Sequence, residues 1–462
     1  MNRFFYASVR RALGVSGLFT LLGFAANCCF SSPAPPVPGK TWLQYAAPGE
    51  AGWSATKLAE ARRYSESIGS ASVFVVYDGA VLAAWGDYQR RFWCHSIRKS
   101  FLSALYGIAV TEGSIDLQKT LADLRIDDRP PLSDREKTAK IRDLLQARSG
   151  IYLPAAYEGA VVKPPRDQFA PGSHWLYNNW DFNVLGTIYE KETHAGIFDR
   201  FKERIADPLQ MEDYRVRDGY YHFEPDQSIY PAYPFRMSAR DMARFGLLFL
   251  RNGRWNQRQI IPAAWVQEST RSYSNTHWVY DGYGYMWWTM EAGRFKDLGM
   301  FSALGAGGHA IDVLPRAKLV VVHRVNTFES KQVEDAKRLT LLNKILDARV
   351  AKPKAHPKLE PLHVLPDLVT SHAISQELLT RYIGRYGLDD QTAVRIAMDG
   401  GVLVLQEAHN GNFGLIPLSA TQFIAEDYLL PVSFELNADG SPARMVIQTA
   451  PNVKISVAFL GR

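Results

Sequence analysis

Apolar residues alternate on either side of a two-residue turn early in the chain. The first run extends from Val73 to Tyr77, the second extends from Val81 to Trp85, and Asp78-Gly79 separates them. This alternation is typical of strands with one buried face, and Asp-Gly favours the positive φ angles of a tight hairpin turn. We therefore predict a β-hairpin here, and with it the start of an antiparallel sheet.

A buried helix is predicted directly after this hairpin. Between Ser96 and Thr111 the apolar residues recur at helical spacing, and Gly113 follows as a candidate C-terminal stop. Further helices are indicated at 141–147, 182–190, 197–205, 239–250 and 263–268, a strand at 283–290, and a second hairpin at 310–314 and 319–325. These elements together predict an α+β domain over residues 51–350.

The pattern changes after residue 350. Residues 351–366 contain four prolines and break both the helical and the strand period, so they are predicted to form a stiff extended linker. Beyond it, over 367–462, short candidate strands lie at 382–388, 393–398, 402–406, 414–417, 422–426, 432–436, 445–448 and 456–459. This spacing predicts a small antiparallel β domain, either a barrel or a sandwich.

The N-terminal residues have the pattern of an export signal. Three arginines accompany an apolar run at 12–26, and no acidic residue occurs before Glu50. We interpret residues 1–30 as a signal peptide and 31–50 as a Pro-rich tether, with Cys28 as a candidate lipidation site. The predicted location is therefore the periplasm or cell envelope. The alternative is an uncleaved membrane anchor, although the run is shorter than the roughly 20 apolar residues that a span needs.

Charge and composition exclude several classes of protein. The 462 residues include 53 Lys and Arg against 47 Asp and Glu, and three of the positive charges lie in the leader. Without a clustered basic stripe, we expect no nucleic-acid surface. A hydrophobic content of 47% excludes a disordered chain. The folded part keeps only Cys94 and shows neither metal-ligand spacing nor a nucleotide-binding loop, so no metal and no cofactor are expected.

Two Ser-x-x-Lys motifs are candidates for nucleophilic catalysis. At this spacing both side chains lie on one face of a helix, so the amine can take the serine proton. Ser54 and Lys57 begin a polar, surface-type helix, and Ser54 is predicted to be its N-cap. Ser96 and Lys99 begin the buried helix, where backbone N–H groups favour a developing oxyanion. We select Ser96 and Lys99; the alternative is an ordinary cap with a lysine that extends to the surface.

A Tyr-x-Asn motif, Tyr177 to Asn179, stands just ahead of the helix predicted at 182–190. A nearby lysine stabilises an ionised phenol, so Tyr177 is a candidate general base toward the serine and later an acid toward the leaving group. Asn179 is a candidate to hold the substrate carbonyl and the lysine. A second such motif, at 273–275, lies in a polar stretch and is interpreted as a loop.

Glycines precede the strand of the second hairpin. Gly305, Gly307 and Gly308 allow a ligand to approach the backbone closely, and an edge-strand N–H there would complete an oxyanion hole with the N–H of Ser96. The alternative is a bulge or a tight turn. The following His309 and most other histidines lack metal-ligand spacing and are interpreted as structural.

Taken in order, Ser96-x-x-Lys99, Tyr177-x-Asn179 and the glycine-rich strand near residue 307 resemble the motifs of the serine β-lactamase and penicillin-binding protein superfamily. Within it the chain looks most like the class C-related branch of esterases, D,D-peptidases and aminohexanoate-dimer hydrolases. The resemblance covers residues 53–326 and implies an antiparallel sheet with helices, an all-helical lobe, and a site between them. The C-terminal part resembles the small β domains appended to such hydrolases.

The resemblance also implies roles for individual residues. Ser96 would be the acylated nucleophile, Lys99 its activating neighbour, Tyr177 the proton shuttle and Asn179 a substrate-orienting group. The backbone N–H groups of Ser96 and Gly308 would form the oxyanion hole.

The third motif departs from the family pattern. Where the family has Lys or His, then Ser or Thr, then Gly, this chain has Gly305-Ala306-Gly307. The cation and hydroxyl that would bind a substrate carboxylate are therefore missing, and His309 or Arg324 are candidates to replace them. Trp180, Tyr285, Trp287 and Trp288 either line an aromatic wall of the site or belong to the core.

The predicted activity is hydrolysis of an ester or amide of a small molecule through an acyl-enzyme on Ser96. A peptidoglycan D,D-carboxypeptidase or β-lactamase is the alternative. It ranks second because β-lactams and D-Ala-D-Ala termini carry a carboxylate, for which this chain lacks the usual binding groups. A non-catalytic protein that binds cell-wall ligands is the second alternative. The expected partners are small-molecule or peptide substrates, with membrane contact only through the leader or a lipid anchor, and the oligomeric state stays open.

Overall fold

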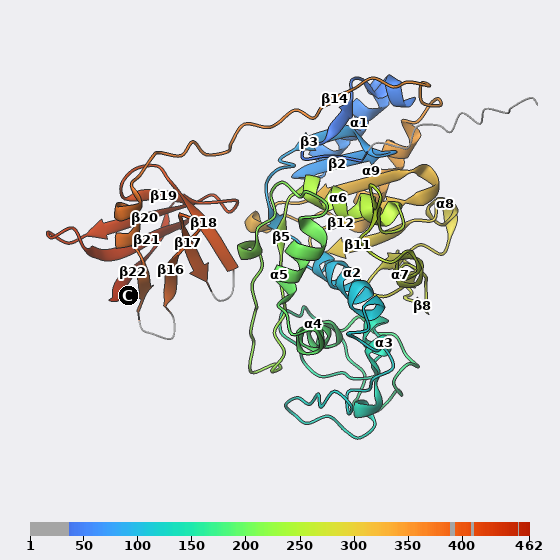
Figure 1. The fold of residues 1–462 in the computed structure, drawn as a ribbon, viewed down its shortest axis with the longest axis horizontal. Helices are drawn as coiled ribbons and strands as arrows, with labels where there is room; N and C mark the ends of the chain where they lie inside the picture. Colours follow the sequence, from blue (N-terminus) through green and yellow to red (C-terminus); the bar gives the residue numbers. More distant parts are fainter. Residues whose placement is uncertain (1–36, 389–392, 408–410, 451) are drawn as a thin grey trace, which may run out of the picture. The chain divides into compact units, whose positions relative to one another are not determined.

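A ten-stranded sheet, in the order β14-β1-β3-β2-β13-β12-β11-β10-β9-β8, forms the framework of the main domain in the computed structural model (Figure 1). The structure describes residues 37–388, 393–407, 411–450 and 452–462, so the predicted signal peptide 1–30 lies outside the described residues. The strands are β1 (Leu43–Tyr45), β2 (Ser72–Tyr77), β3 (Ala80–Gly86), β8 (Ser274–Asn275), β9 (Gly282–Tyr283), β10 (Trp288–Thr289), β11 (Phe301–Gly305), β12 (His309–Leu314), β13 (Leu319–Arg324) and β14 (Leu359–Pro361).

Both predicted hairpins are confirmed and lie next to each other in the sheet. In the turn between β2 and β3, Asp78 has φ 47° and Gly79 has φ 95°, as the Asp-Gly pair predicts. Strand β13 pairs with both β12 and β2, with Val321 opposite Val75. These three central strands are buried along their whole length, which explains the valine runs of β2 and β13.

Helices cover the sheet and extend away from it. In the main domain they are α1 (Ala55–Ser67), α2 (Ile97–Thr111), α3 (Ile141–Leu145), α4 (Asn179–Thr193), α5 (Ile197–Phe201), α6 (Ala239–Leu250), α7 (Ala263–Ser269), α8 (Gly293–Asp297) and α9 (Asp335–Asp347). Helix α10 (Gln376–Arg381) instead packs on the C-terminal barrel through Leu379. Helix α6 packs on β2, β12 and β13, and α1 packs on α9, a helix that the sequence analysis did not predict. Figure 1 shows α2 running from the sheet toward α3 and α4, so it joins the sheet to the helical lobe.

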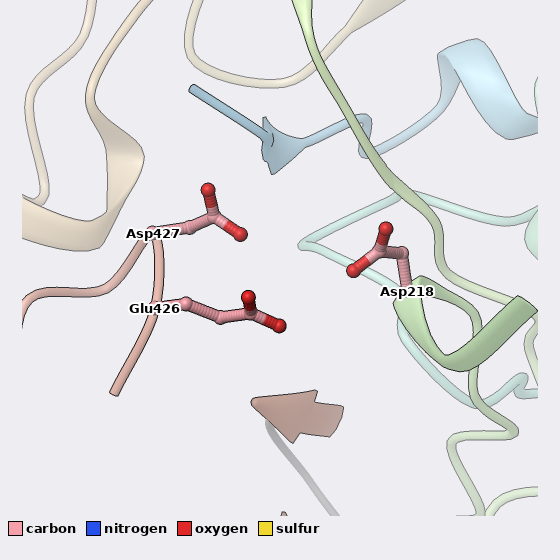
Figure 2. Close-up of side chains that lie close together, drawn as sticks. All are labelled: Asp218, Glu426 and Asp427. Carbon is pink, nitrogen blue, oxygen red and sulfur yellow. The ribbon is translucent and has the colours of Figure 1, made fainter. Parts of the chain in front are cut away.

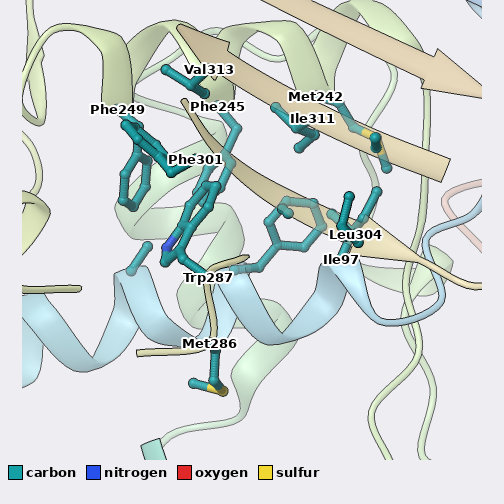
Figure 3. Close-up of a cluster of buried hydrophobic side chains, with 14 of the residues drawn as sticks. Ile97, Met242, Phe245, Phe249, Met286, Trp287, Phe301, Leu304, Ile311 and Val313 are labelled. Carbon is teal, nitrogen blue, oxygen red and sulfur yellow. The ribbon is translucent and has the colours of Figure 1, made fainter. Parts of the chain in front are cut away.

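Aromatic residues from several elements form the core between α2, α6 and the sheet (Figure 3). The ring centroids of Trp287 and Phe249 are 4.5 Å apart, and those of Trp287 and Phe301 are 5.3 Å apart. Ile97, the first residue of α2, is fully buried and lies beside Leu304 of β11 in this cluster. Burial of Ile97 therefore fixes the start of α2, and with it Ser96, against the sheet.

The strand predicted at 283–290 is wrong. Residues Tyr283 and Trp288 face each other on two short antiparallel strands, β9 and β10, and not on one. The chain reverses between them because Met286 adopts a left-handed backbone conformation with φ 61°, and its N–H donates to the carbonyl of Leu145. The helix predicted at 197–205 ends as α5 at Phe201 and continues as a π-helical turn, Lys202–Ala206.

The C-terminal β domain is a closed barrel, which decides between the two predicted forms. Its strands are β15 (Gly384–Gly387), β16 (Val394–Asp399), β17 (Val402–Glu407), β18 (Gly411–Pro417), β19 (Gln422–Ala425), β20 (Leu430–Leu436), β21 (Pro442–Ala450) and β22 (Val453–Gly461). Tyr382, Tyr386, Phe423 and Phe434 form an aromatic core inside it. The α+β fold with an appended all-β domain is thus confirmed.

Two segments predicted to be extended connections belong in part to the sheet. Strand β1 lies within the predicted tether 31–50, and β14 lies within the predicted linker 351–366. The two pair antiparallel at the edge of the sheet, with Gln44 opposite Glu360. Backbone pairing, which the proline-rich composition obscured, holds these segments against the main domain. Among the described residues, no helix has the length and apolar character needed to cross a bilayer.

Candidate active site

The two Ser-x-x-Lys motifs occupy different environments. The Ser54 hydroxyl accepts a hydrogen bond from the Lys57 N–H, so Ser54 caps α1 as predicted. Ser96 stands at the N-cap position of α2 but its side chain makes no capping bond. Of the residues that the structure describes, none accepts a hydrogen bond from the Ser96 N–H. The Ser96 N–H is therefore available at the positive end of the helix dipole, and its hydroxyl is not used for capping.

Lys99 is the centre of the candidate site. Its Nζ lies 2.9 Å from Ser96 Oγ and 2.7 Å from Asn179 Oδ1, and it also contacts the Tyr177 hydroxyl. Only 1% of Lys99 is exposed. The structure therefore brings together the four side chains selected from the two sequence motifs, although Tyr177 and Asn179 lie about 80 residues from Ser96 in the sequence.

Local structure explains how the second motif reaches the lysine. The Asn178 side chain accepts a hydrogen bond from the Trp180 N–H and caps α4, so Asn179 is the first residue of that helix. The aromatic ring of Tyr177 packs on Phe182 and on Trp288, with centroid distances of 5.0 and 5.2 Å. These contacts direct the Tyr177 hydroxyl toward Lys99.

Burial separates the proton affinities of the two titratable groups. Desolvation, followed by the positive charge of Arg98, holds the pKa of Lys99 well below its usual range. Desolvation raises the pKa of Tyr177 to about 12, against the opposing effects of Ser96 and Arg98. This differs from the predicted tyrosinate base, because burial outweighs the neighbouring charge. The arrangement favours an uncharged Lys99 as the base and a protonated Tyr177 as the acid.

A loop that the sequence analysis missed orients Asn179. The Asn179 side-chain amide donates to the Tyr157 carbonyl, and its backbone N–H donates to Glu158 Oε1 at 3.1 Å. Glu158 is in turn paired with Lys163, with 2.6 Å between Nζ and Oε2. No local motif marks these residues, since the contact depends on how the loop folds back over α4.

The glycine-rich turn lies against the segment that precedes Ser96. A Cβ atom added to Gly305 would be 2.4 Å from the Cys94 carbonyl oxygen, so only glycine allows this approach. Gly307 and Gly308 have φ angles of 86° and 96°, which also favour glycine. The Gly308 N–H donates to the Gly305 carbonyl at 3.3 Å and closes the turn. The N–H predicted for the oxyanion hole is thus already paired, while that of Ser96 is not.

His309 and Arg324 do not face a substrate. His309 is 1% exposed, and its Nδ1 accepts a hydrogen bond from Arg324 Nε at 2.9 Å. Arg324 is fully buried and also donates to the carbonyls of Phe92, Trp93 and Met237. Their strand positions direct both side chains into the protein, so neither replaces the missing carboxylate-binding cation.

The candidate aromatic residues divide between core and site. Trp180, Tyr285 and Trp287 are buried in the core. Trp288 is also buried in the core, but it links Tyr177 to Trp278, whose ring centroid is 5.0 Å from that of Trp288. Trp278 is 48% exposed. An aromatic row therefore extends from the candidate site to solvent.

A cluster of three carboxylates is the one group among the described residues with the spacing of a metal site. Figure 2 shows Glu426 and Asp427 pointing toward Asp218. However, Arg91 contacts all three at 2.8 to 3.2 Å, and Arg236 contacts Asp218 and Asp427 at 2.9 and 3.3 Å. Guanidinium groups neutralise these carboxylates, so the cluster is a buried ion network that ties the barrel to the main domain.

The chain is similar in sequence and in fold to known proteins. A family model described as Beta-lactamase matches residues 55–344. An uncharacterised protein of Alkalihalophilus pseudofirmus is 22% identical over 302 residues, which cover 57% of this chain and 85% of that protein. A D-aminopeptidase of Brucella anthropi is 28% identical over 162 residues, 30% of this chain and 31% of that enzyme. The match to the crystal structure of SurE covers 89% of this chain and 99% of the SurE chain, with 16% identity and a TM-score of 0.50. It therefore supports the fold alone.

Proposed function

The chain belongs to the beta-lactamase family, whose relatives are serine hydrolases, and we propose that it cleaves an ester or amide bond of a small molecule through an acyl-enzyme on Ser96. The observation that carries the proposal is the position of Lys99 Nζ, 2.9 Å from Ser96 Oγ and in contact with the Tyr177 hydroxyl. A buried amine at this distance can accept the serine proton as the nucleophile attacks.

The proton then has a direct route to the leaving group. As Ser96 Oγ bonds to the substrate carbonyl carbon, its proton passes to the uncharged Lys99 amine. Tyr177, which touches Lys99, gives its own proton to the departing oxygen or nitrogen and regains one from Lys99. Attack by water on the acyl-enzyme, with the protons moving in reverse, releases the acid and restores Ser96. The Ser96 N–H at the start of α2 stabilises the oxyanion in both steps.

The surroundings of the site favour substrates without a free carboxylate. Gly305 to Gly307 offer no side-chain cation or hydroxyl, and Arg324 and His309 are buried and bonded to each other. A carboxylate at that position would lose its hydration without gaining a charged partner. The aromatic row that ends at Trp278 instead suits an apolar group on the substrate.

The test compares two serines that share one motif. Purified protein is incubated with a short-chain p-nitrophenyl ester and, separately, with a penicillin, and both turnover and intact mass are measured. Ser96→Ala should abolish ester turnover, whereas Ser54→Ala, which removes only the cap of α1, should leave it unchanged.

Each other outcome has a defined meaning. A stable penicilloyl adduct on Ser96, or rapid penicillin hydrolysis, would support a D,D-carboxypeptidase or β-lactamase. If neither substrate is turned over and a fluorophosphonate probe does not label Ser96, the chain is a binding protein that has kept the cleft of its family.

A further inference from the structure

The residue before the nucleophile, His95, has an unusual backbone and two side-chain partners. Its φ angle is 47°, in the left-handed region that is uncommon for residues other than glycine. Its Nδ1 lies 3.0 Å from the Tyr157 hydroxyl, and its Nε2 lies 3.0 Å from Thr327 Oγ1. These partners are 62 and 232 residues away in sequence, so the imidazole bridges two distant loops at the point where the chain turns into α2.

The first partner connects His95 to the catalytic lysine. The Tyr157 carbonyl accepts the side-chain amide of Asn179, and Asn179 Oδ1 accepts a hydrogen bond from Lys99. Lys99 contacts Ser96, which is covalently attached to His95. The contacts that lead from His95 through Tyr157, Asn179 and Lys99 therefore return to Ser96 and close a ring that includes the nucleophile.

The second partner connects His95 to the glycine-rich turn. A Cβ atom added to Gly307 would be 2.6 Å from Thr327 Cγ2, so the turn packs directly on this threonine. Thr327 Oγ1 also lies 3.4 Å from Nε2 of His309, which is itself bonded to Arg324. Thr327 thus links His95 to Gly307 within the turn and to His309 directly after it.

From these contacts we infer that His95 is a positioning residue. It fixes the position of Ser96 relative to Lys99 and Asn179 on one side and relative to the glycine-rich turn on the other. The inference rests on the proposed function of Ser96. Burial, together with the positive charges of Arg324 and Arg98, lowers the pKa of His95 to about 4, so the imidazole is uncharged at neutral pH. An uncharged ring supplies one donor and one acceptor, which matches its two hydroxyl partners.

The test removes the ring while keeping the backbone conformation. His95→Gly retains the left-handed backbone and deletes both hydrogen bonds, and His95→Asn retains the backbone and a shorter polar side chain. His194→Gly is the matched control, because His194 is exposed, has φ 53° and lies at the end of α4. The measurements are kcat and KM for p-nitrophenyl esters, the rate of fluorophosphonate labelling of Ser96, and the melting temperature.

We expect His95→Gly to lower kcat and the labelling rate at least tenfold, with KM changed less than threefold, and His194→Gly to leave all three unchanged. Thr327→Val should lower kcat and the labelling rate by a similar factor. The double variant His95→Gly/Thr327→Val should lose little more activity than either single variant, since both substitutions break the same bridge. His95→Gly with at least half of the wild-type labelling rate, or independent losses in the double variant, would overturn the inference.

Two further outcomes remain decisive. If His95→Gly does not fold, as judged by circular dichroism, Thr327→Val tests the same bridge from its other end. If the wild-type protein is not labelled on Ser96 at all, the proposed function fails. Equal labelling of wild type and variants means that only the positioning role is refuted.

Discussion

Replacing Gly305 by alanine tests how closely β11 must approach the nucleophile loop. The added Cβ would lie 2.4 Å from the Cys94 carbonyl oxygen, whereas ordinary contact begins at 3.4 Å. The same carbonyl accepts the Ile97 N–H at 3.1 Å and so forms part of the start of α2. The strand and the loop must therefore separate by about 1 Å.

Both stability and catalysis should respond. Overpacking of this kind costs about 1 to 3 kcal/mol, which corresponds to a fall in melting temperature on the order of 5 °C for a domain of this size. A displacement of about 1 Å at reacting groups can lower the rate about 100-fold. We therefore expect Gly305→Ala to lose about two orders of magnitude in kcat for ester hydrolysis while the protein remains folded at 25 °C.

The control is Gly49→Ala. An alanine Cβ at Gly49 would have no atom within 4 Å, and the backbone there is not left-handed, so kcat and melting temperature should stay at wild-type values. Initial rates with p-nitrophenyl esters and thermal unfolding by circular dichroism measure both effects. If Gly305→Ala keeps more than half of the wild-type kcat and an unchanged melting temperature, the close approach is not needed for catalysis.

Four further predictions follow from the charges of the site and of the ion network. Lys99→Met should lower kcat for esters at least 1000-fold with the fold intact, and normal turnover by this variant would exclude the lysine as base. Lys99 acts uncharged and its pKa is lowered, so kcat/KM should be lost only as pH falls through that depressed pKa. Above it, kcat/KM should stay level as pH rises until Tyr177 ionises near 12. An acid limb at the pKa of an ordinary lysine would contradict this. Arg98→Met removes a positive neighbour of Lys99, raises its pKa and should move the acid limb of the kcat/KM profile to higher pH; a limb that does not move rules out the charge effect. Asp218→Asn removes a carboxylate that the buried Arg91 and Arg236 share, and should lower the free energy of unfolding, measured in urea, by about 3 to 5 kcal/mol. A decrease below about 1 kcal/mol would show that the network is not important for stability.

Local patterns predicted most of the fold because the signals of those elements are themselves local. Helix α6 occupies residues 239–250 as predicted, and each of the predicted barrel strands is present, since alternation and turn residues mark them. The strand at 283–290 failed because its residues are nearly all apolar and nothing polar marks the reversal at Met286. That reversal depends on a contact with Leu145, which no local pattern contains.

The same distinction applies to the site. Ser96 and Lys99 are three residues apart on a helix, so their contact follows from spacing. No local spacing fixes the contact of Lys99 with Tyr177, which the chemistry of the Tyr-x-Asn motif and the family resemblance suggested. His309 and Arg324 were considered as substrate ligands, but the faces of β12 and β13 that carry them point inward. The bridge made by His95 was missed because its partners come from two loops whose positions the sequence does not encode locally.

The pairing of β1 with β14 has a practical consequence for protein engineering. It brings the segment before α1 beside the segment after α9, and Trp42, next to β1, is fully buried with its indole N–H bonded to the Arg240 carbonyl. Recombinant chains trimmed beyond Tyr45 would lose this anchor and leave β3 as an open edge, at which other chains can add strands and aggregate. Because both ends of the main domain meet at one sheet edge, a short peptide could join them, and the domain is suited to circular permutation with new termini in an exposed loop.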